Sequence, residues 1–209
     1  MVFEADISSQ NASVQKDTPS KQAMPQKAMP ASADSWQEIA NGTAHVRLSD
    51  EDYMRLALKE AHHAEALGEV PIGAVVVYEP IDPATRKSLE LPRVIACAHN
   101  LRETTHDPAG HAEFLAMEAA SHALQAWRLT DCTVYVTLEP CIMCAGLMHQ
   151  ARVSRCVYGA YDTKAGALGT LYEIHKDTRL NHTFEVKGGV LENECSQIIS
   201  SFFANKRKK

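Results

Sequence analysis

Cys141 and Cys144 have the residue type and the spacing of metal ligands. They are three residues apart and follow directly after the apolar run 134–138 and Pro140. Proline favours the first position of a helix, so we predict that a helix runs from Pro140 to about residue 150 and that both sulfurs lie in its first turn, where they can reach one ion. Positive potential at a helix N-terminus lowers the pKa of a thiol and favours the thiolate that binds zinc.

A Cys-x-x-Cys pair alone is ambiguous, because a redox pair and half of a structural zinc site have the same spacing. His111 and Glu113 help to distinguish these alternatives from a catalytic zinc site. His111 adds a third ligand at the start of a predicted helix over 108–125. Three protein ligands leave one corner of a tetrahedral zinc site for water, whereas a structural site has a fourth ligand. Zinc lowers the pKa of bound water to about 7, so the neighbouring Glu113 carboxylate can take its proton and pass it to a substrate. The set predicts a catalytic site with one Zn2+ per subunit; a zinc site that only stabilises the fold would give Glu113 no role.

Composition gives the setting for this site. The chain has 209 residues, of which 45% are hydrophobic, and a formal net charge of -5, so total charge indicates no polyanionic partner and any nucleic-acid contact must come from local basic patches. We find no secretory signal and no spanning segment, which predicts a reduced, cytoplasmic protein with no membrane partner. Four further cysteines are interpreted as apolar core residues: Cys97, Cys132, Cys156 and Cys195. We assign no chemistry to the remaining histidines, His63 and His99 among them.

The chain divides into an extension and one domain. Residues 1–46 are rich in Ser, Gln, Ala, Lys and Pro and have little periodicity, so we predict a disordered N-terminal extension. A transit peptide is the alternative, but such peptides are rich in arginine and poor in acidic residues, unlike this segment. Residues 47–209 are predicted to form the catalytic domain.

Hydrophobic periodicity predicts an α/β fold in this domain. Ser49 and Asp52 form a capping-box pattern ahead of a helix that ends at Gly68. Two β-branched runs, 72–78 and 93–99, are joined by a polar stretch over 79–92 and predict an antiparallel pair. Helices then alternate with strands, which predicts a mixed five-stranded sheet covered on both faces. The other predicted elements are strands at 133–138, 153–158 and 184–190, a short helical piece near 168–176 and a closing helix at 191–205.

The motifs together resemble a known family, the bacterial tRNA-specific adenosine deaminases of the cytidine deaminase superfamily. His-x-Glu paired with Pro-Cys-x-x-Cys is the signature of zinc-dependent cytosine and adenine deaminases as a whole. The resemblance extends from about Asp50 to Arg207. The stretch 159–167 and the C-terminal half resemble the tRNA-specific enzymes in particular, among all deaminases of the superfamily. The matching segments are 70–74, 106–108, 111–113, 137–146, 159–167, 180–182, 188–191 and 202–203.

The resemblance implies a three-layer α/β/α fold of the cytidine deaminase type, and deamination of the wobble adenosine of a tRNA anticodon to inosine. It also implies a homodimer that binds the anticodon stem-loop. By matching positions, Asn100 corresponds to the residue that orients the adenine and its sugar, and Asp162 and Lys164 to anticodon-loop contacts. The RNA-facing end of the last helix corresponds to Phe202, Phe203, Lys206 and Arg207.

The physical reading of that C-terminal end leaves two interpretations. Aromatic and basic side chains together suit stacking on splayed bases and neutralising phosphates. A helix anchored by phenylalanine with a solvated charged tip has the same composition. Relative to the family, Ala109-Gly110 replaces Thr-Ala, Thr170 replaces Ser, and the 79–92 loop is longer.

Two other functions remain open at this point. A small-molecule deaminase of the same superfamily, acting on guanine, cytosine or dCMP, would use the same zinc machinery. A non-catalytic, zinc-bound RNA-binding subunit is the second, but an intact Glu113 argues against it because such a subunit needs no group that moves protons.

Overall fold

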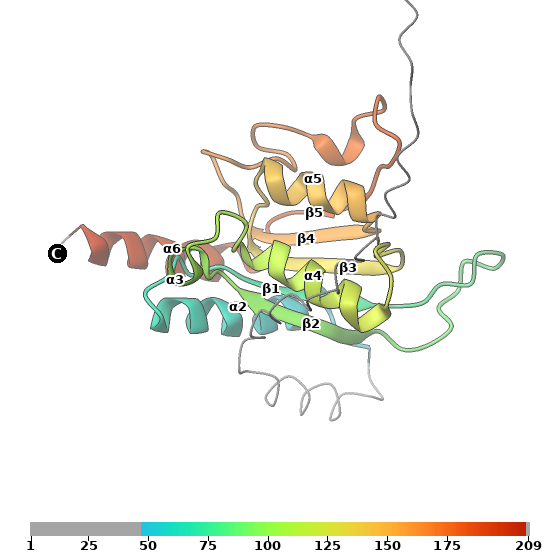
Figure 1. Cartoon of the computed structure of the whole chain (residues 1–209), viewed down its shortest axis with the longest axis horizontal. Helices are drawn as coiled ribbons and strands as arrows, with labels where there is room; N and C mark the ends of the chain where they lie inside the picture. The colour runs from blue at the N-terminus through green and yellow to red at the C-terminus, as the bar shows by residue number, and fades with distance from the viewer. Residues whose placement is uncertain (1–46, 208–209) are drawn as a thin grey trace, which may run out of the picture. The chain divides into compact units, whose positions relative to one another are not determined.

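A mixed sheet of five strands forms the centre of the described chain (Figure 1). The computed structural model describes residues 47–207, so the predicted disorder of residues 1–46 lies outside the described residues. The strand order is β2-β1-β3-β4-β5, with β1 antiparallel to β2 and β3, and β3, β4 and β5 parallel. The strands are β1 (Gly73–Tyr78), β2 (Arg93–His99), β3 (Cys132–Leu138), β4 (Arg155–Ala160) and β5 (Glu185–Lys187).

Helices cover both faces of this sheet, which confirms the predicted three-layer α/β/α fold. Alternate side chains of each strand point to opposite faces, so Val76 packs with the helices on one side and Val75 with those on the other. The first side carries the two helices whose N-termini hold the predicted ligands, and the second side carries the first and last long helices. The pairs are α4 (Ala112–Leu124) with α5 (Ile142–Ala151), and α2 (Asp50–Ala66) with α6 (Glu192–Lys206).

The start of α2 is fixed by the predicted capping box. The Ser49 hydroxyl accepts a hydrogen bond from the Asp52 N–H at 3.2 Å, and the Asp52 carboxylate accepts one from the Ser49 N–H at 3.1 Å. Farther along, α2 packs so closely on β1 that a side chain at Gly73 would collide with the backbone of α2 at Ala57. The glycine is therefore required by helix-to-strand distance.

Asp50 joins α2 to three strands. Its carboxylate accepts hydrogen bonds from the Tyr135 hydroxyl at 3.0 Å, from Arg155 Nη1 at 2.7 Å and from Lys187 Nζ at 2.7 Å. The Arg155 guanidinium holds the pKa of Asp50 well below its usual range. These bonds fix α2 across β3, β4 and the end of β5.

The boundaries of the two central helices differ from those predicted. The helix predicted from residue 108 begins at Ala112, because residues 107–110 close a tight turn in which the Gly110 N–H donates to the Asp107 carbonyl at 2.9 Å. The helix predicted from Pro140 begins at Ile142. A short helix that we did not predict, α3 (Arg102–Thr105), precedes the turn.

The C-terminal part also contains less regular structure than predicted. The helical piece near 168–176 is reduced to one 3-10 turn, η1 (Ile174–Lys176), and the strand predicted over 184–190 is β5 alone. The long 79–92 loop forms a hairpin-like arm with a bridge between Ile81 and Ser88, and it extends away from the sheet (Figure 1). Within residues 47–207, no helix combines the length and hydropathy needed to cross a membrane.

Candidate metal centre and active site

The structure brings the three predicted ligands together. His111 Nδ1 lies 3.7 Å from Cys141 Sγ and 3.6 Å from Cys144 Sγ. A tetrahedral zinc ion bonded to one imidazole nitrogen and one thiolate separates these atoms by about 3.6 Å. The donor set, one nitrogen and two sulfurs, and its spacing therefore fit zinc. Among the described residues, these three form one of two groups of potential ligands close enough to share an ion.

Two helix N-termini position the ligands. His111 is the N-cap of α4 and Cys141 the N-cap of α5, while Cys144 lies in the first turn of α5. The prediction that Cys141 lies inside the helix is wrong. Cys141 has an extended backbone, with φ -73° and ψ 173°, and immediately precedes α5. Its carbonyl accepts the first hydrogen bond of the helix, from the Ala145 N–H at 2.9 Å. Cys141 and Cys144 both follow β3 directly, so the site lies at the carboxyl end of a parallel strand, where α/β sheets bind ligands.

The two sulfurs differ in their affinity for a proton. The Cys144 thiol donates a hydrogen bond to Cys141 and thereby lowers the pKa of Cys141 to about 3, with a further contribution from His111. The pKa of Cys144 is raised by this same hydrogen bond, by its burial and by the charge of Glu113. The predicted effect of the helix N-terminus is thus secondary to the contact between the sulfurs. An ion bound by both sulfurs must displace the shared proton, so metal binding here releases protons.

Glu113 lies beside the ligands without being one of them. It occupies the first turn of α4 and is buried, with 4% of its surface exposed. Burial raises its pKa above the ordinary value for a glutamate, and the charge of His111 opposes that rise. A carboxyl group with a raised pKa, held beside potential metal ligands, is suited to both accept and donate a proton.

Glu139 is a functional residue that the sequence did not reveal. It is 2% exposed, and its carboxylate accepts hydrogen bonds from the N–H groups of Asp162 at 3.1 Å, Leu168 at 3.1 Å and Thr170 at 3.0 Å, and from the Thr170 hydroxyl. A side chain at Gly166 would collide with this carboxylate. Glu139, two residues before Cys141, thus holds the 162–170 loop close to the start of α5.

Asn100 is held by a second buried carboxylate that was not predicted. Asn100 is 5% exposed, and its Nδ2 donates to Glu69 Oε2 at 2.9 Å; the other Glu69 oxygen accepts from the Thr104 N–H at 2.6 Å. The next residue, Leu101, donates its N–H to the Gly110 carbonyl at 2.9 Å. This bond brings the end of β2 to the turn that immediately precedes His111.

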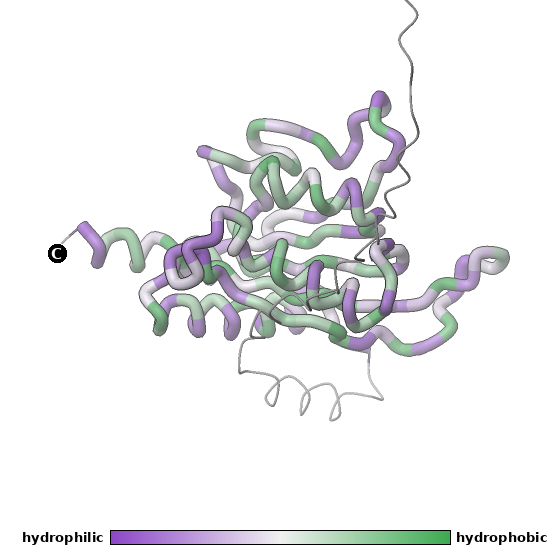
Figure 2. The backbone as a smooth tube through the Cα atoms, viewed as in Figure 1, coloured by the Kyte–Doolittle hydropathy of each residue, from purple (hydrophilic) through white to green (hydrophobic). Residues whose placement is uncertain are grey.

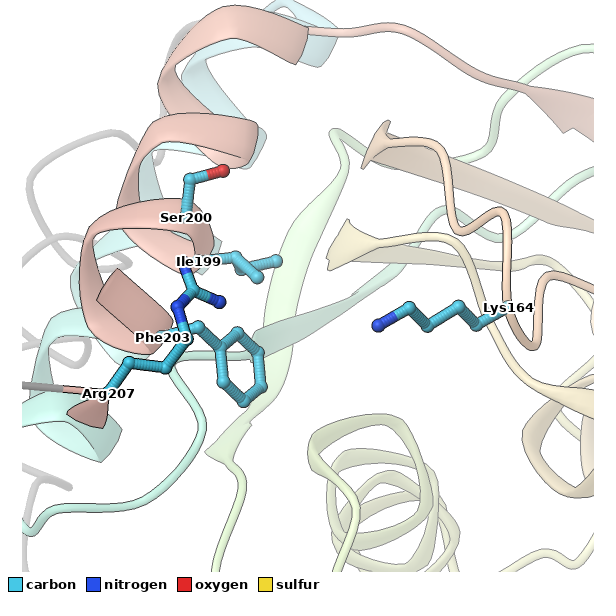
Figure 3. A pocket seen from close by; sticks show the side chains of 5 residues that line it. All are labelled: Lys164, Ile199, Ser200, Phe203 and Arg207. Carbon is cyan, nitrogen blue, oxygen red and sulfur yellow. The ribbon is translucent and has the colours of Figure 1, made fainter. Parts of the chain in front are cut away.

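The predicted RNA-contact residues lie on two facing segments. Lys164 extends across a cavity of about 310 Å³ towards Ile199, Phe203 and Arg207 of α6 (Figure 3). Figure 2 shows that the end of α6 is hydrophilic, and Lys206 and Arg207 are both exposed there.

The other predicted contacts have structural partners. Phe202 is buried, with the Lys206 ammonium 4.9 Å from its ring, whereas Phe203 is 42% exposed. Phe202 therefore anchors α6, and Phe203 is the exposed ring of the pair. Asp162 Oδ1 accepts the N–H groups of Lys164 at 2.8 Å and Ala165 at 3.2 Å, so this carboxylate shapes the loop that presents Lys164.

Sequence and structure comparisons agree on the class of protein. The model for the MafB19-like deaminase family matches residues 48–207. The tRNA-specific adenosine deaminase of Bacillus subtilis is 49% identical over 77% of this chain and 92% of its own length, and that of Haemophilus influenzae is 44% identical over 77% and 86%.

Solved structures give the same fold. One from studies of A-to-I editing by tRNA deaminases at the wobble position has a TM-score of 0.61 and 37% identity, and the match covers 70% of this chain and 98% of that one. A guanine deaminase from Nitrosomonas europaea has a TM-score of 0.62 over 87% and 99% of the two chains, but at 22% identity this likeness concerns the fold alone.

Replacing Glu139 tests its role in holding the 162–170 loop. We expect Glu139→Gln to lower the free energy of unfolding by about 3 kcal/mol. The carboxylate accepts hydrogen bonds with both oxygens, whereas the amide NH2 of glutamine would face backbone N–H groups that are themselves donors. Denaturant unfolding with measurement of zinc content checks this. Thr170→Ser is the matched control: it keeps the hydroxyl bond and should leave both values unchanged. Equal stability of the Glu139→Gln and wild-type proteins would contradict the assignment.

Proposed function

Because the chain belongs to the tRNA-specific adenosine deaminases of the MafB19-like deaminase family, we propose that it hydrolyses adenosine to inosine at the wobble position of a tRNA anticodon. The observation that carries the proposal is the His111, Cys141 and Cys144 cluster with buried Glu113 beside it. Relatives and a solved structure with these activities in their names match most of the domain. The cluster supports the reaction, and the relatives support the substrate.

The reaction needs a nucleophile and a proton carrier. Water replaces the amino group at the C6 carbon of adenine, and ammonia leaves. His111, Cys141 and Cys144 would hold a zinc ion, which would supply a Lewis acid that makes water a stronger nucleophile at neutral pH. Glu113 takes one proton from the water and delivers it to N1, the ring nitrogen bonded to C6. It then moves the proton of the new C6 hydroxyl to the amino group, which leaves as ammonia while the C6 carbonyl forms. The burial and raised pKa of Glu113 suit both transfers.

Asn100 is the proposed residue that orients the adenosine. Its Nδ2 is engaged by Glu69, which fixes the plane of the amide and assigns Oδ1 as the acceptor for a substrate group. Because the neighbouring Leu101 is bonded to the turn before His111, the substrate contact and the metal ligand belong to one rigid assembly. The unpaired anticodon loop lowers the energetic cost of extruding a base into such a pocket.

Glu113→Gln, assayed on tRNA, tests both chemistry and substrate. We expect wild-type protein to convert the wobble adenosine, read as an A-to-G change on sequencing, and to leave free guanine, cytosine and dCMP unchanged. Glu113→Gln should retain one zinc ion and lose about 10²–10⁴-fold in turnover, because a neutral amide cannot accept the proton. His111→Ala is the complementary variant and should lose the zinc.

Three outcomes of this assay would contradict the proposal. Reaction of a free base or nucleotide with no change in tRNA would assign a small-molecule deaminase. Near-normal turnover by Glu113→Gln with intact zinc would remove its role as proton carrier. Zinc binding without activity on any tRNA or base would indicate the non-catalytic RNA-binding subunit.

Lys164, Phe203 and Arg207 are the proposed anticodon-loop contacts. They combine two cations that can neutralise phosphates with one exposed ring that can stack on a base. Asp162 contributes by shaping the loop, Phe202 by anchoring the helix, and Lys206 by adding charge at the helix end.

Arg207→Ala tests this surface. We expect KM for tRNA to rise several-fold and kcat to change little, because the charge contributes to binding away from the reacting atoms. The slope of the logarithm of the tRNA-binding constant against the logarithm of salt concentration should become shallower by about 1, the value for one lost phosphate contact. Lys59→Ala, at an exposed lysine of α2, is the control with the same change in charge and should match wild type. Identical salt dependence in Arg207→Ala and wild type would contradict the assignment.

We also infer a homodimer, with the groove between α4 and α5 as its interface. Phe114, Met117, Leu147 and Trp127 line this groove, and Trp127 is 57% exposed although it is a large apolar side chain. Self-association of this face would bury the ring. A tRNA substrate implies a cytoplasmic location for the assembly, which cell fractionation checks.

Sedimentation equilibrium tests the dimer. We expect a mass of twice the 23.0 kDa chain, and a shift to the mass of one chain in Trp127→Glu, because a buried unpaired charge opposes association. Leu89→Glu, on the 79–92 arm, introduces the same charge at a 64% exposed residue and should remain dimeric. A single-chain mass for wild type would overturn the inference.

A further inference from the structure

A second cluster of ligand-type side chains lies between α2 and β2, outside the active site. Glu60 and His63 are three residues apart on α2, and His99 is the last residue of β2. One ligand atom from each residue lies within 4.8 Å of the others. These residues have no part in the proposed deamination, and the sequence analysis assigned His63 and His99 no chemistry.

The distances within this cluster are close to those of atoms that share an ion. Glu60 Oε2 lies 2.8 Å from His99 Nδ1 and 3.4 Å from His63 Nδ1. A carboxylate oxygen and an imidazole nitrogen bonded to the same zinc ion lie about 2.9–3.4 Å apart at angles of 90° to 109°. The distance to His63 lies within that range, and the distance to His99, at hydrogen-bond length, is about 0.1 Å below it. A glutamate and a histidine three apart on a helix are also a recurring ligand pair in helical metalloproteins, because both side chains project from the same face.

Burial and access favour a bound ion over a set of surface groups. The side chains of Glu60 and His99 are 5% and 6% exposed, so two of the donors are held in place by the surrounding core. His63 is 47% exposed and covers the outer side, which gives an ion a path from solvent. Both histidines direct Nδ1 towards the Glu60 carboxylate, and their rings meet edge to face with centroids 5.9 Å apart.

We propose that Glu60, His63 and His99 form a second metal site, for a divalent transition-metal ion of the zinc type. Two imidazoles and one carboxylate match the donors that zinc, nickel and copper prefer, whereas magnesium and calcium prefer oxygen ligands. Solvent completes the coordination on the side of His63. The ion joins α2 to the end of β2, one residue before Asn100, so its binding stabilises the strand end that carries this substrate contact.

Metal stoichiometry tests the site without reference to activity. Protein purified with its active-site zinc is titrated with Zn2+ and examined by native mass spectrometry and thermal unfolding. We expect wild type to bind two zinc ions per chain, and His63→Gln to bind one, since glutamine removes the solvent-side ligand. At a free zinc concentration a hundredfold above Kd, the second ion should raise Tm by about 5–10 °C in wild type and leave His63→Gln unshifted. Mg2+ should give no shift in either protein.

His62→Gln is the matched control. His62 is adjacent on α2 and 65% exposed on its side chain, and it contacts Glu65 instead of Glu60, so this variant should bind two zinc ions as wild type does. The retained active-site zinc shows that each variant is folded. The proposal is overturned if wild type binds a single zinc ion throughout the titration, which would leave the cluster as a buried ion pair. It is equally overturned if His63→Gln still binds the second ion.

Discussion

The carboxylate of Glu139 is the contact on which the active site depends. It is a buried charge, and such a charge is tolerated in a protein core only where donors surround it. Here three backbone N–H groups and one hydroxyl from the 162–170 loop fill that requirement. The loop cannot move away without leaving the charge unpaired. As Glu139 comes two residues before Cys141, the loop that carries Lys164 is positioned by the same residue that leads into the metal-binding helix.

A second buried carboxylate does the same on the other side of the metal centre. Glu69 binds the Asn100 side chain and the backbone of α3, and the adjacent Leu101 is bonded to the turn before His111. Neither carboxylate touches the metal-binding atoms. Each carboxylate instead fixes a connecting loop next to a candidate ligand. A metal centre assembled from distant segments requires such support, because its ligands must be held within about 0.5 Å of their working positions.

The sequence predicted which side chains meet in the candidate site, because metal-binding chemistry restricts residue type and spacing. His111, Cys141 and Cys144 must be ligands at particular separations, and the strands and helices around them follow from hydrophobic periodicity. Glu69 and Glu139 escaped prediction because their partners, backbone N–H groups together with the Asn100 amide and the Thr170 hydroxyl, are 23 to 35 residues away, and no local pattern encodes such pairs. The starts of α4 and α5 were misplaced for a related reason: a tight turn over 107–110 and an extended Cys141 are set by tertiary hydrogen bonds and override the preference of proline for a helix start.

The division between chemistry and substrate recognition follows from the fold. The candidate metal ligands lie at two helix N-termini, those of α4 and of α5, the helix that follows the central strand β3, and a guanine deaminase shares this fold at 22% identity. Lys164, Phe203 and Arg207 instead lie on a loop and at the free end of α6, where side chains can change without disturbing the core. Selection can therefore alter the substrate while the ligands stay fixed. For this reason the proposal of deamination rests on His111, Glu113, Cys141 and Cys144. The proposal of a tRNA substrate rests on other residues and on the similarity to tRNA-specific relatives.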